Sequence, residues 1–319
     1  MEGASLAVSR RNVPADRLIL AGRPDELAPL QAEFGIEAVE VEPCSEVVAM
    51  DESPASAIRT KPDSSIARGM RVVAEGRAGA FVSAGNTGAV VASSAMILGR
   101  LPGVSRPGIA VPVPTHQGGP CVVIDVGANI YCKAEHMLQY AVMAGEYCRA
   151  VFDRPDPRVG LLNIGEEAGK GNPLIQEVDE LLRASDVTYR GFIEGQDIMS
   201  GNVDVVVCEG FVGNVILKVT EGLVSFVSKQ VHAAFEEHPP RPEVKSSLGK
   251  AFQQLDYAEY GGAPLLGVGA PVLIGHGRSS AHALMNMIHA AATALEHDVT
   301  RHITDRLAQQ PQNPGRSLS

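Results

Sequence analysis

The sequence predicts an α/β fold in which helices cover a doubly wound, mostly parallel sheet in three layers. Apolar strands and helical segments alternate along most of the 319 residues, which is the order that parallel strands joined by crossover helices produce. The strands are short and apolar on both faces, as in a sheet buried on both sides. Several strands end in turns rich in glycine and asparagine, at the edge where such sheets bind ligands.

Apolar periodicity and the residues that end each segment predict the individual elements. Strands are expected at residues 18–22, 38–41, near Ala80, near Cys121, and at 159–163, 204–208 and 271–275. Helices are expected at residues 2–10, 25–34, 56–75 with an interruption near Pro62, from Thr87 onward, and at 135–152, 173–184 and 280–297.

Residues 215–260 break this alternation. Two helices, at 215–235 and 242–260, are joined by a linker that contains Pro239 and Pro240, so we expect a helical hairpin inserted before the last strand. The apolar residues of this hairpin need a surface to pack against, which is its own domain, a membrane surface or a second copy of the chain. These residues are Val224, Phe226, Val227, Val231 and Phe235. We expect a homodimer through Phe226, Val227 and Phe235, with only weak lipid binding.

Residues 1–308 are expected to form a single α/β domain, and the polar residues 309–319 a disordered tail. The chain opens on a helix, whereas a doubly wound sheet usually opens on a strand. We therefore expect the sequence upstream of Met1 to encode, in frame, an apolar strand and a Gly-Gly-Asp loop.

Composition narrows the class of function. A net charge of −10 argues against nucleic acid as the main partner. Five cysteines without paired spacing favour reduced thiols and a cytoplasmic protein. The sequence has no apolar run long enough to span a bilayer, and residues 1–12 lack the apolar core of a signal peptide.

The turn from Ser83 to Gly88 is the strongest functional signal. Gly85 and Asn86 precede a helix that begins near Thr87, so backbone N–H groups and the helix dipole point at one place, which suits an anion. The turn lacks the Lys-Ser/Thr of a P-loop, and small residues are also common in tight turns for structural reasons alone. Similar turns after other strands, with Asp125 and Asn129 and with Gly213 and Asn214, predict one composite site for a phosphate-bearing substrate.

Three further side chains are candidates for this site, each with a structural alternative. Lys170 follows a strand within a glycine-rich loop and is either a phosphate ligand or a solvated lysine. Lys218 shares a helix face with Asn214 and is either a cleft lysine or a snorkelling surface lysine. His276 ends the last strand and is either an acid–base group or a structural histidine. Cys208 is expected to be a buried strand residue rather than a nucleophile.

At these residues the chain resembles the bacterial phosphate acyltransferase family, PlsX, the fatty acid/phospholipid synthesis proteins. The shared blocks run in family order: Lys61-Pro62-Asp63-Ser64-Ser65, residues 82–89, Arg106-Pro107, residues 125–129, residues 161–167, Lys170-Gly171-Asn172, residues 192–195, residues 210–214 and residues 260–267. Two positions differ from the family pattern. Glu209 stands where the family has Asp, and the loop after His276 lacks an acidic residue. Family members also usually open with a strand and an Asp-Ala-Met-Gly-Gly-Asp loop, which this sequence does not contain.

The resemblance implies transfer of a fatty acyl group from acyl carrier protein to inorganic phosphate, on a fold like that of the isocitrate and isopropylmalate dehydrogenases. It implies a homodimer and, in some members, peripheral association with the membrane; contact with a glycerol-3-phosphate acyltransferase fits the use of the product. No cofactor and no metal are expected.

Because phosphate is itself the nucleophile, helix N-termini and asparagine amides suffice for this chemistry. We expect catalytic roles for Asn86, Lys170, Asn214 and His276, and phosphate or substrate binding by Ser83, Gly85, Thr87, Gly88, Asp125, Asn129, Gly213 and Lys218. Two alternatives stay open at this point. One is a metal-dependent hydroxyacid dehydrogenase, and the other is a non-catalytic scaffold that binds acyl carrier protein or phospholipid-synthesis partners.

Overall fold

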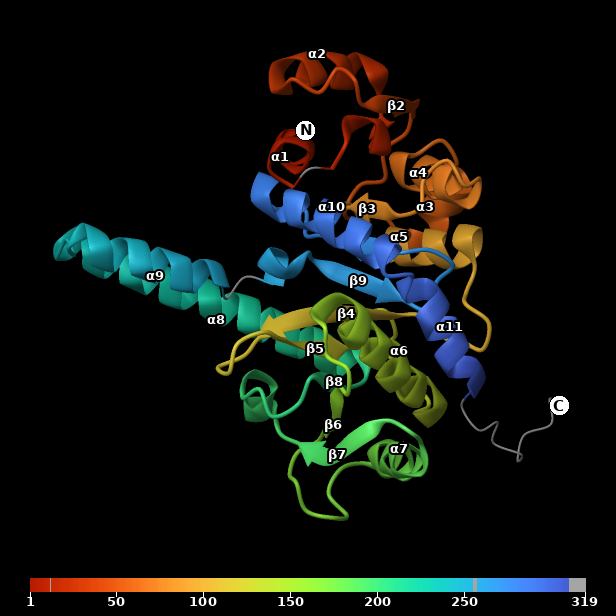
Figure 1. Cartoon of the computed structure of the whole chain (residues 1–319), viewed down its shortest axis with the longest axis vertical. Coiled ribbons are helices and arrows are strands. Elements are labelled where there is room, and N and C mark those ends of the chain that lie inside the picture. Colours follow the sequence, from red (N-terminus) through yellow and green to blue (C-terminus); the bar gives the residue numbers. More distant parts are fainter. Residues whose placement is uncertain (12, 255–256, 310–319) are drawn as a thin grey trace.

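The computed structural model describes residues 1–11, 13–254 and 257–309, and its strands form two sheets (Figure 1). The smaller sheet is the parallel pair β1 (Ile19–Gly22) and β2 (Glu40–Pro43). The larger sheet has eight strands in the order β3-β10-β9-β4-β5-β8-β6-β7. Its strands are β3 (Phe81–Ser83), β4 (Gly108–Pro114), β5 (Pro120–Ile124), β6 (Arg158–Leu162), β7 (Thr188–Ile193), β8 (Val205–Val207), β9 (Ala263–Leu266) and β10 (Val272–Ile274).

The large sheet is mixed, with parallel pairs on both sides of an antiparallel centre. Strands β3–β10, β5–β8, β8–β6 and β6–β7 pair in parallel. Strands β10–β9, β9–β4 and β4–β5 pair antiparallel. The expected α/β class with a mostly parallel sheet is therefore confirmed at this coarser level.

The antiparallel centre changes where the turns fall. Three reversals separate β10 from β5, so β3 and β10 run opposite to β5, β8 and β6. The carboxyl ends of β3 and β10 therefore lie at the other edge of the sheet from those of β5, β8 and β6. The expectation that all the glycine and asparagine turns share one edge is wrong, because β4 and β9 were not predicted from the sequence.

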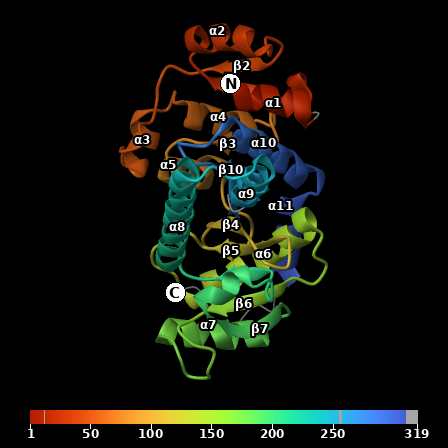
Figure 2. The same cartoon turned by 90° about the vertical axis from the view of Figure 1, so that its left-hand side faces the viewer.

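Helices cover both faces of the sheet. Their bounds are α1 (Glu2–Arg10), α2 (Pro24–Phe34), α3 (Pro54–Thr60), α4 (Ser65–Ala74), α5 (Thr87–Ser93), α6 (Ala134–Phe152), α7 (Pro173–Ala184), α8 (Gly210–Glu237), α9 (Pro242–Gln254), α10 (Ala281–Glu296) and α11 (Val299–Gln309). Figure 2 shows the strands down the middle, with α5 and α8 on one side and α10 and α11 on the other.

Alternation along the strands divides the core between these two faces. Val111 and Val123 pack in one cluster, with residues of α4, α5 and α8. Ala110 and Val122 pack in the other cluster, with residues of α6, α7 and α11.

Most elements expected from the sequence are present, with small shifts at their ends. The helix expected at residues 56–75 is two helices, α3 and α4, which are interrupted around Pro62 as expected. Helix α8 begins at Gly210 rather than at residue 215. The second hairpin helix ends at Gln254 and is followed by a 3-10 turn at Tyr257–Tyr260. The prediction of a disordered tail at residues 309–319 falls outside the described residues, apart from Gln309 at the end of α11.

Helix α8 extends beyond the sheet together with α9, so the expected projecting hairpin is present (Figure 1). Phe226 and Val227 are exposed on it, and Phe235 is half-buried. By length and composition α8 could also cross a membrane, so the expectation that no apolar run is long enough to do so is wrong; a single helix of this kind is weak evidence for a membrane span. The described chain contains no partner for this surface.

Candidate active site

The residues expected to form one site lie in two separate clusters. The α8 cluster consists of Asp125, Asn129, Gly213 and Asn214, where β5 and β8 end. The β3 cluster lies at the opposite edge, where β3 and β10 end, and consists of Ser83, Gly85, Asn86, Thr87, Gly88 and His276. Strands β3 and β5 are four positions apart in the sheet, which is about 19 Å at the usual strand spacing. The two clusters therefore follow strands that end at opposite edges of the sheet.

Asp125 organises the turn of the α8 cluster. Its carboxylate is fully buried and accepts hydrogen bonds from the backbone N–H groups of Ile109, Gly127, Ala128 and Asn129, at 2.8–3.1 Å. Burial raises the pKa of this carboxyl, and the donors oppose that rise. Asp125 consequently holds the turn in place and has no oxygen facing a substrate.

Asn129 continues this network. Its side-chain amide donates to the carbonyl of Pro107 at 2.7 Å, to Asp125 at 3.1 Å and to the hydroxyl of Tyr140 at 2.8 Å. Burial raises the pKa of Tyr140 far above its ordinary value, so this hydroxyl is neutral at physiological pH. The sequence did not indicate Tyr140, since it lies inside a helix, α6, whose residues 140–148 are all buried.

Two glycines allow the first turn of α8 to pack directly on this turn. A Cβ at Gly210 or Gly213 would overlap the backbone carbonyl oxygen of Asn129 or Asp125, respectively. The N–H of Gly210 donates to the carbonyl of Asn129 at 3.1 Å. Glu209, the residue before the helix, makes no capping hydrogen bond with its side chain. The positive end of α8 is thus fixed beside the turn.

Asn214 is the exposed member of this cluster and lies against Gly127. Within the described part of the chain, no group forms a hydrogen bond with its side-chain amide. An amide that is held next to a helix N-terminus and is still free can bind a phosphate or carbonyl oxygen.

Four cations lie on segments that adjoin the α8 cluster in the chain or at the same sheet edge: Lys170, Lys218, Arg106 and Lys133. Lys170 lies in the loop after β6, whose carboxyl end is at the same edge because β6 pairs in parallel with β8. Lys218 is exposed and pairs with Glu221 at 2.9 Å, which favours its surface interpretation. Arg106 and Lys133 were not predicted as cations of the site. Arg106 precedes Pro107, whose carbonyl accepts a hydrogen bond from Asn129. Burial lowers the pKa of His136, and the charges of Arg106 and Lys133 lower it further.

Asn86, in the β3 cluster, is buried and fully engaged by the protein. Its oxygen caps α5 by accepting from the N–H of Ala89 at 3.0 Å. Its nitrogen donates to the carbonyls of Ala49, Met50 and Glu52 at 3.0–3.2 Å. These contacts hold the segment around Met50 against the start of α5. This structural role of Asn86 was not predicted from the sequence.

The other members of the β3 cluster are more accessible. Thr87 is exposed at the first position of α5, and Gly88 packs against Pro54, where a Cβ would overlap that ring. His276 is exposed, and its Nδ1 accepts from the N–H of Arg278 at 3.1 Å, which leaves the proton of a neutral ring on Nε2. Ser83 accepts from the N–H of Gly85 at 3.1 Å.

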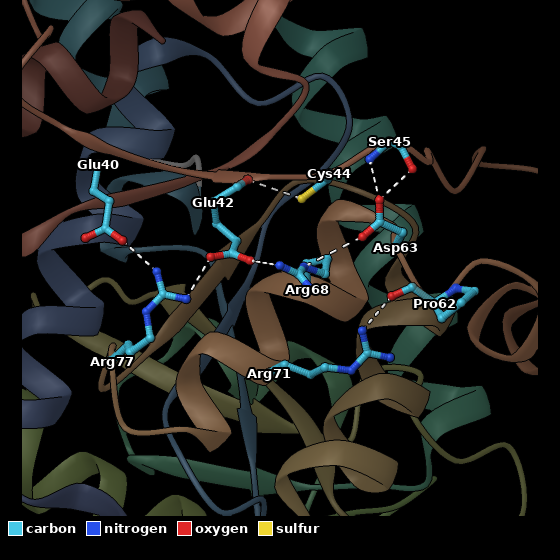
Figure 3. A network of polar contacts seen from close by, with 9 residues as sticks. All are labelled: Glu40, Glu42, Cys44, Ser45, Pro62, Asp63, Arg68, Arg71 and Arg77. Atoms are coloured by element: carbon cyan, nitrogen blue, oxygen red, sulfur yellow. Dashed lines mark hydrogen bonds and ion pairs between the residues drawn. The ribbon is translucent and has the colours of Figure 1, made fainter.

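A network of charged side chains connects β2 and the residues after it to α4 (Figure 3). Glu42 of β2 is buried and pairs with both Arg68 and Arg77. Hydrogen bonding from Arg77 lowers the pKa of the Glu42 carboxyl, against the opposing effect of burial. Asp63 accepts from the backbone and hydroxyl of Ser45. The shared block that begins at Lys61 therefore joins β2 to α4.

Two further expectations concern other kinds of chemistry. Burial raises the pKa of the Cys208 thiol, whose sulfur faces the carbonyl of Asp125, so the structural interpretation of this cysteine is favoured. Among the described residues, no three His, Cys, Asp or Glu side chains are grouped so that they could hold a metal ion.

Comparison with known proteins agrees with the resemblance found in the sequence. A family model described as "Fatty acid synthesis protein" matches residues 1–302. The phosphate acyltransferase of Acidobacterium capsulatum is 44% identical over 299 residues, covering 92% of this chain and 88% of that protein. The phosphate acyltransferase of Myxococcus xanthus is 43% identical over 299 residues, covering 91% and 85%.

Solved structures give a likeness in fold. A phosphotransacetylase from Streptococcus pyogenes has a TM-score of 0.62 at 18% identity, covering 92% of this chain and 93% of that one. At this identity the likeness concerns the fold alone. The family model and the curated relatives extend over nearly the whole described chain. The chain therefore belongs to the fatty acid synthesis protein family, whose members include the bacterial phosphate acyltransferases.

Proposed function

We propose that this protein transfers a fatty acyl group from acyl carrier protein to inorganic phosphate, giving an acyl phosphate for phospholipid synthesis. The curated relatives, named phosphate acyltransferases at 41–44% identity, support the reaction. The observation that carries the proposal is the fixed N-terminus of α8 beside the free amide of Asn214. A preorganised set of donors of this kind stabilises the charge that develops in acyl transfer.

In the proposed reaction, a phosphate oxygen attacks the thioester carbonyl carbon. A carbon–oxygen bond forms, the carbon–sulfur bond breaks, and the electron pair leaves with the thiolate of the carrier. The amide of Asn214 and the N-terminus of α8 would bind the developing oxyanion, while Lys170 and Arg106 would neutralise phosphate. His276 lies at the opposite edge of the same chain, so the thiolate would leave without protonation by this residue.

Several finer features belong to the same proposal. The mixed sheet with helices on both faces is compatible with a fold of the isocitrate and isopropylmalate dehydrogenase type. The exposed apolar hairpin supports a homodimer, and its length leaves room for a weak peripheral contact with the membrane. Acyl carrier protein and inorganic phosphate are the partners that the reaction requires, in the cytoplasm, and a glycerol-3-phosphate acyltransferase would take up the product.

The direct test is acyl-phosphate formation by the purified chain from palmitoyl acyl carrier protein and phosphate, with hydroxylamine trapping of the product. We expect Asn214→Ala to reduce turnover about a hundredfold, the usual effect of removing one oxyanion donor. Asn202→Ala is the matched control, since this exposed amide contacts only Gln117 in the described chain. Binding of acyl carrier protein without any acyl phosphate would favour the non-catalytic scaffold.

A further inference from the structure

A large cavity lies between helix α8 and the sheet. Its volume is about 640 Å³, within the range of small-molecule sites. The floor consists of β4 and β5, with Val111, Val113 and Val123, and a 3-10 helix at Gly195–Met199 forms one side. Ile216 and Val224 of α8 form part of the wall. Within the described residues, no side chain fills this space.

The geometry of α8 explains why the cavity exists. Gly213 brings the first turn into direct contact with the backbone of Asp125, so the helix starts on the sheet. Farther along, the helix projects away from the sheet (Figure 1). The space between the diverging helix and the strands is lined mainly by apolar side chains, among them Val113, Ile216 and Val224. An open, largely apolar space of this size is typical of sites that bind small molecules.

We propose that this cavity binds the fatty acyl chain of the substrate, a step that rests on the proposed function. One end of the cavity is lined by Gly213 and Val126, which adjoin the α8 cluster. The other end is lined by Ser228 of α8, Phe252 of α9 and His116. The reacting carbonyl would therefore lie beside Asn214, with the hydrocarbon chain extending along α8 toward the hairpin.

The dimensions suit a long chain. Gly213 and Ser228 both line the cavity, and 15 residues of helix span about 22 Å. One leaflet of a bilayer holds its acyl chains within about 15 Å, half of the hydrocarbon core. The cavity thus has room for a whole fatty acyl chain rather than for a short acyl group alone.

The wall also carries polar groups, from α8 (Thr220, Glu221, Ser225 and Ser228), from the 3-10 helix (Gln196) and from the loop after β4 (His116). Glu221 lines the cavity and pairs with Lys218 at 2.9 Å through one carboxylate oxygen, while its other oxygen is buried without a hydrogen-bond partner among the described residues.

The first test shortens the cavity. Val224 lies about 16 Å along the helix from Gly213, so Val224→Trp should block only the far part. With palmitoyl acyl carrier protein we expect kcat/KM to fall at least about tenfold, since several methylene groups lose their burial. With butanoyl acyl carrier protein it should change less than about twofold. Val219→Trp, at a position 62% exposed on the same helix, is the matched control and should alter neither value. An equal response to both donors would overturn the proposal.

The second test measures binding without catalysis. Because the chain contains no tryptophan, Phe252→Trp places a single fluorophore at the far end of the cavity. A brominated palmitoyl acyl carrier protein should quench its emission saturably and leave the Val219→Trp emission unchanged. Absence of saturable quenching refutes the cavity as the acyl site, even where acyl phosphate is formed. If the emission is quenched but the protein forms no acyl phosphate, the cavity is supported as the acyl-binding site and the proposed reaction is refuted.

Discussion

Replacing Gly213 by alanine tests the packing that places α8 on the α8 cluster. A Cβ at this position would overlap the carbonyl oxygen of Asp125 and would lie 2.9 Å from the sulfur of Cys208. Ordinary contacts between such atoms are about 3.5–4.0 Å, so the first turn of α8 must move by at least about 1 Å. Neither obstacle is the flexible end of a side chain, since one is backbone and the other is a buried cysteine.

This displacement has two measurable consequences. Overpacking of a close contact costs about 1–3 kcal/mol, and alanine in a helix returns about 1 kcal/mol relative to glycine. We therefore expect Gly213→Ala to lose up to about 2 kcal/mol of unfolding free energy in urea. A shift of about 1 Å at reacting groups can cost about a hundredfold in rate, so acyl-phosphate formation should fall by up to that factor.

Gly222→Ala is the control on the same helix. A Cβ there meets nothing within 4 Å, so this variant should gain up to about 1 kcal/mol from helix propensity and keep its activity. If Gly213→Ala is as stable and as active as Gly222→Ala, the tight packing of α8 on the Asp125 turn is refuted, together with its role in placing Asn214.

Three further predictions concern charge, phosphate and assembly. Glu42→Gln should lower the free energy of unfolding by about 1.5–3 kcal/mol at pH 7. Because hydrogen bonding with Arg77 holds the pKa of Glu42 below its ordinary 4.5, this loss should shrink as pH falls below about 4. An equal loss at all pH values in urea unfolding would contradict this prediction. Lys170→Ala should raise the KM for phosphate about tenfold with little change in kcat, whereas the exposed control Lys229→Ala should not; equal KM values would exclude Lys170. The double change Phe226→Glu and Phe235→Glu should give monomers by light scattering, and a persisting dimer would rule out the hairpin interface.

The sequence predicted the elements whose signals are local. Helix α7 lies at Pro173–Ala184, as expected, because Asn172 caps it by accepting from Ile175 and Pro173 occupies its first turn. The interruption near Pro62 likewise appears between α3 and α4. Such features depend on a few neighbouring residues, and the sequence contains all of them.

Strand direction depends on pairing partners that are distant in sequence, and here the sequence was insufficient. Strand β4 contains two prolines, Pro112 inside it and Pro114 at its end, which concealed a buried strand. Strand β9, at Ala263–Leu266, lies inside a family block and was not recognised as a strand. Because β4 and β9 were not predicted, the antiparallel pairings that place the β3 cluster and the α8 cluster at opposite edges of the sheet could not be predicted either. The members of each cluster were thus predictable, but their spatial relation was not.

Asn86 shows how the same residue type supports two opposite expectations. An asparagine before a helix either presents its amide to a ligand or caps the helix, and in the structure all of its polar atoms are engaged by protein groups. We expect Asn86→Ala to lose about 2 kcal/mol of stability, from the lost cap and the unpaired carbonyls. Turnover per folded molecule, corrected for the folded fraction by urea titration, should fall less than about tenfold, below the effect of losing an oxyanion donor. Unchanged stability with a hundredfold slower turnover would instead assign Asn86 to the reaction.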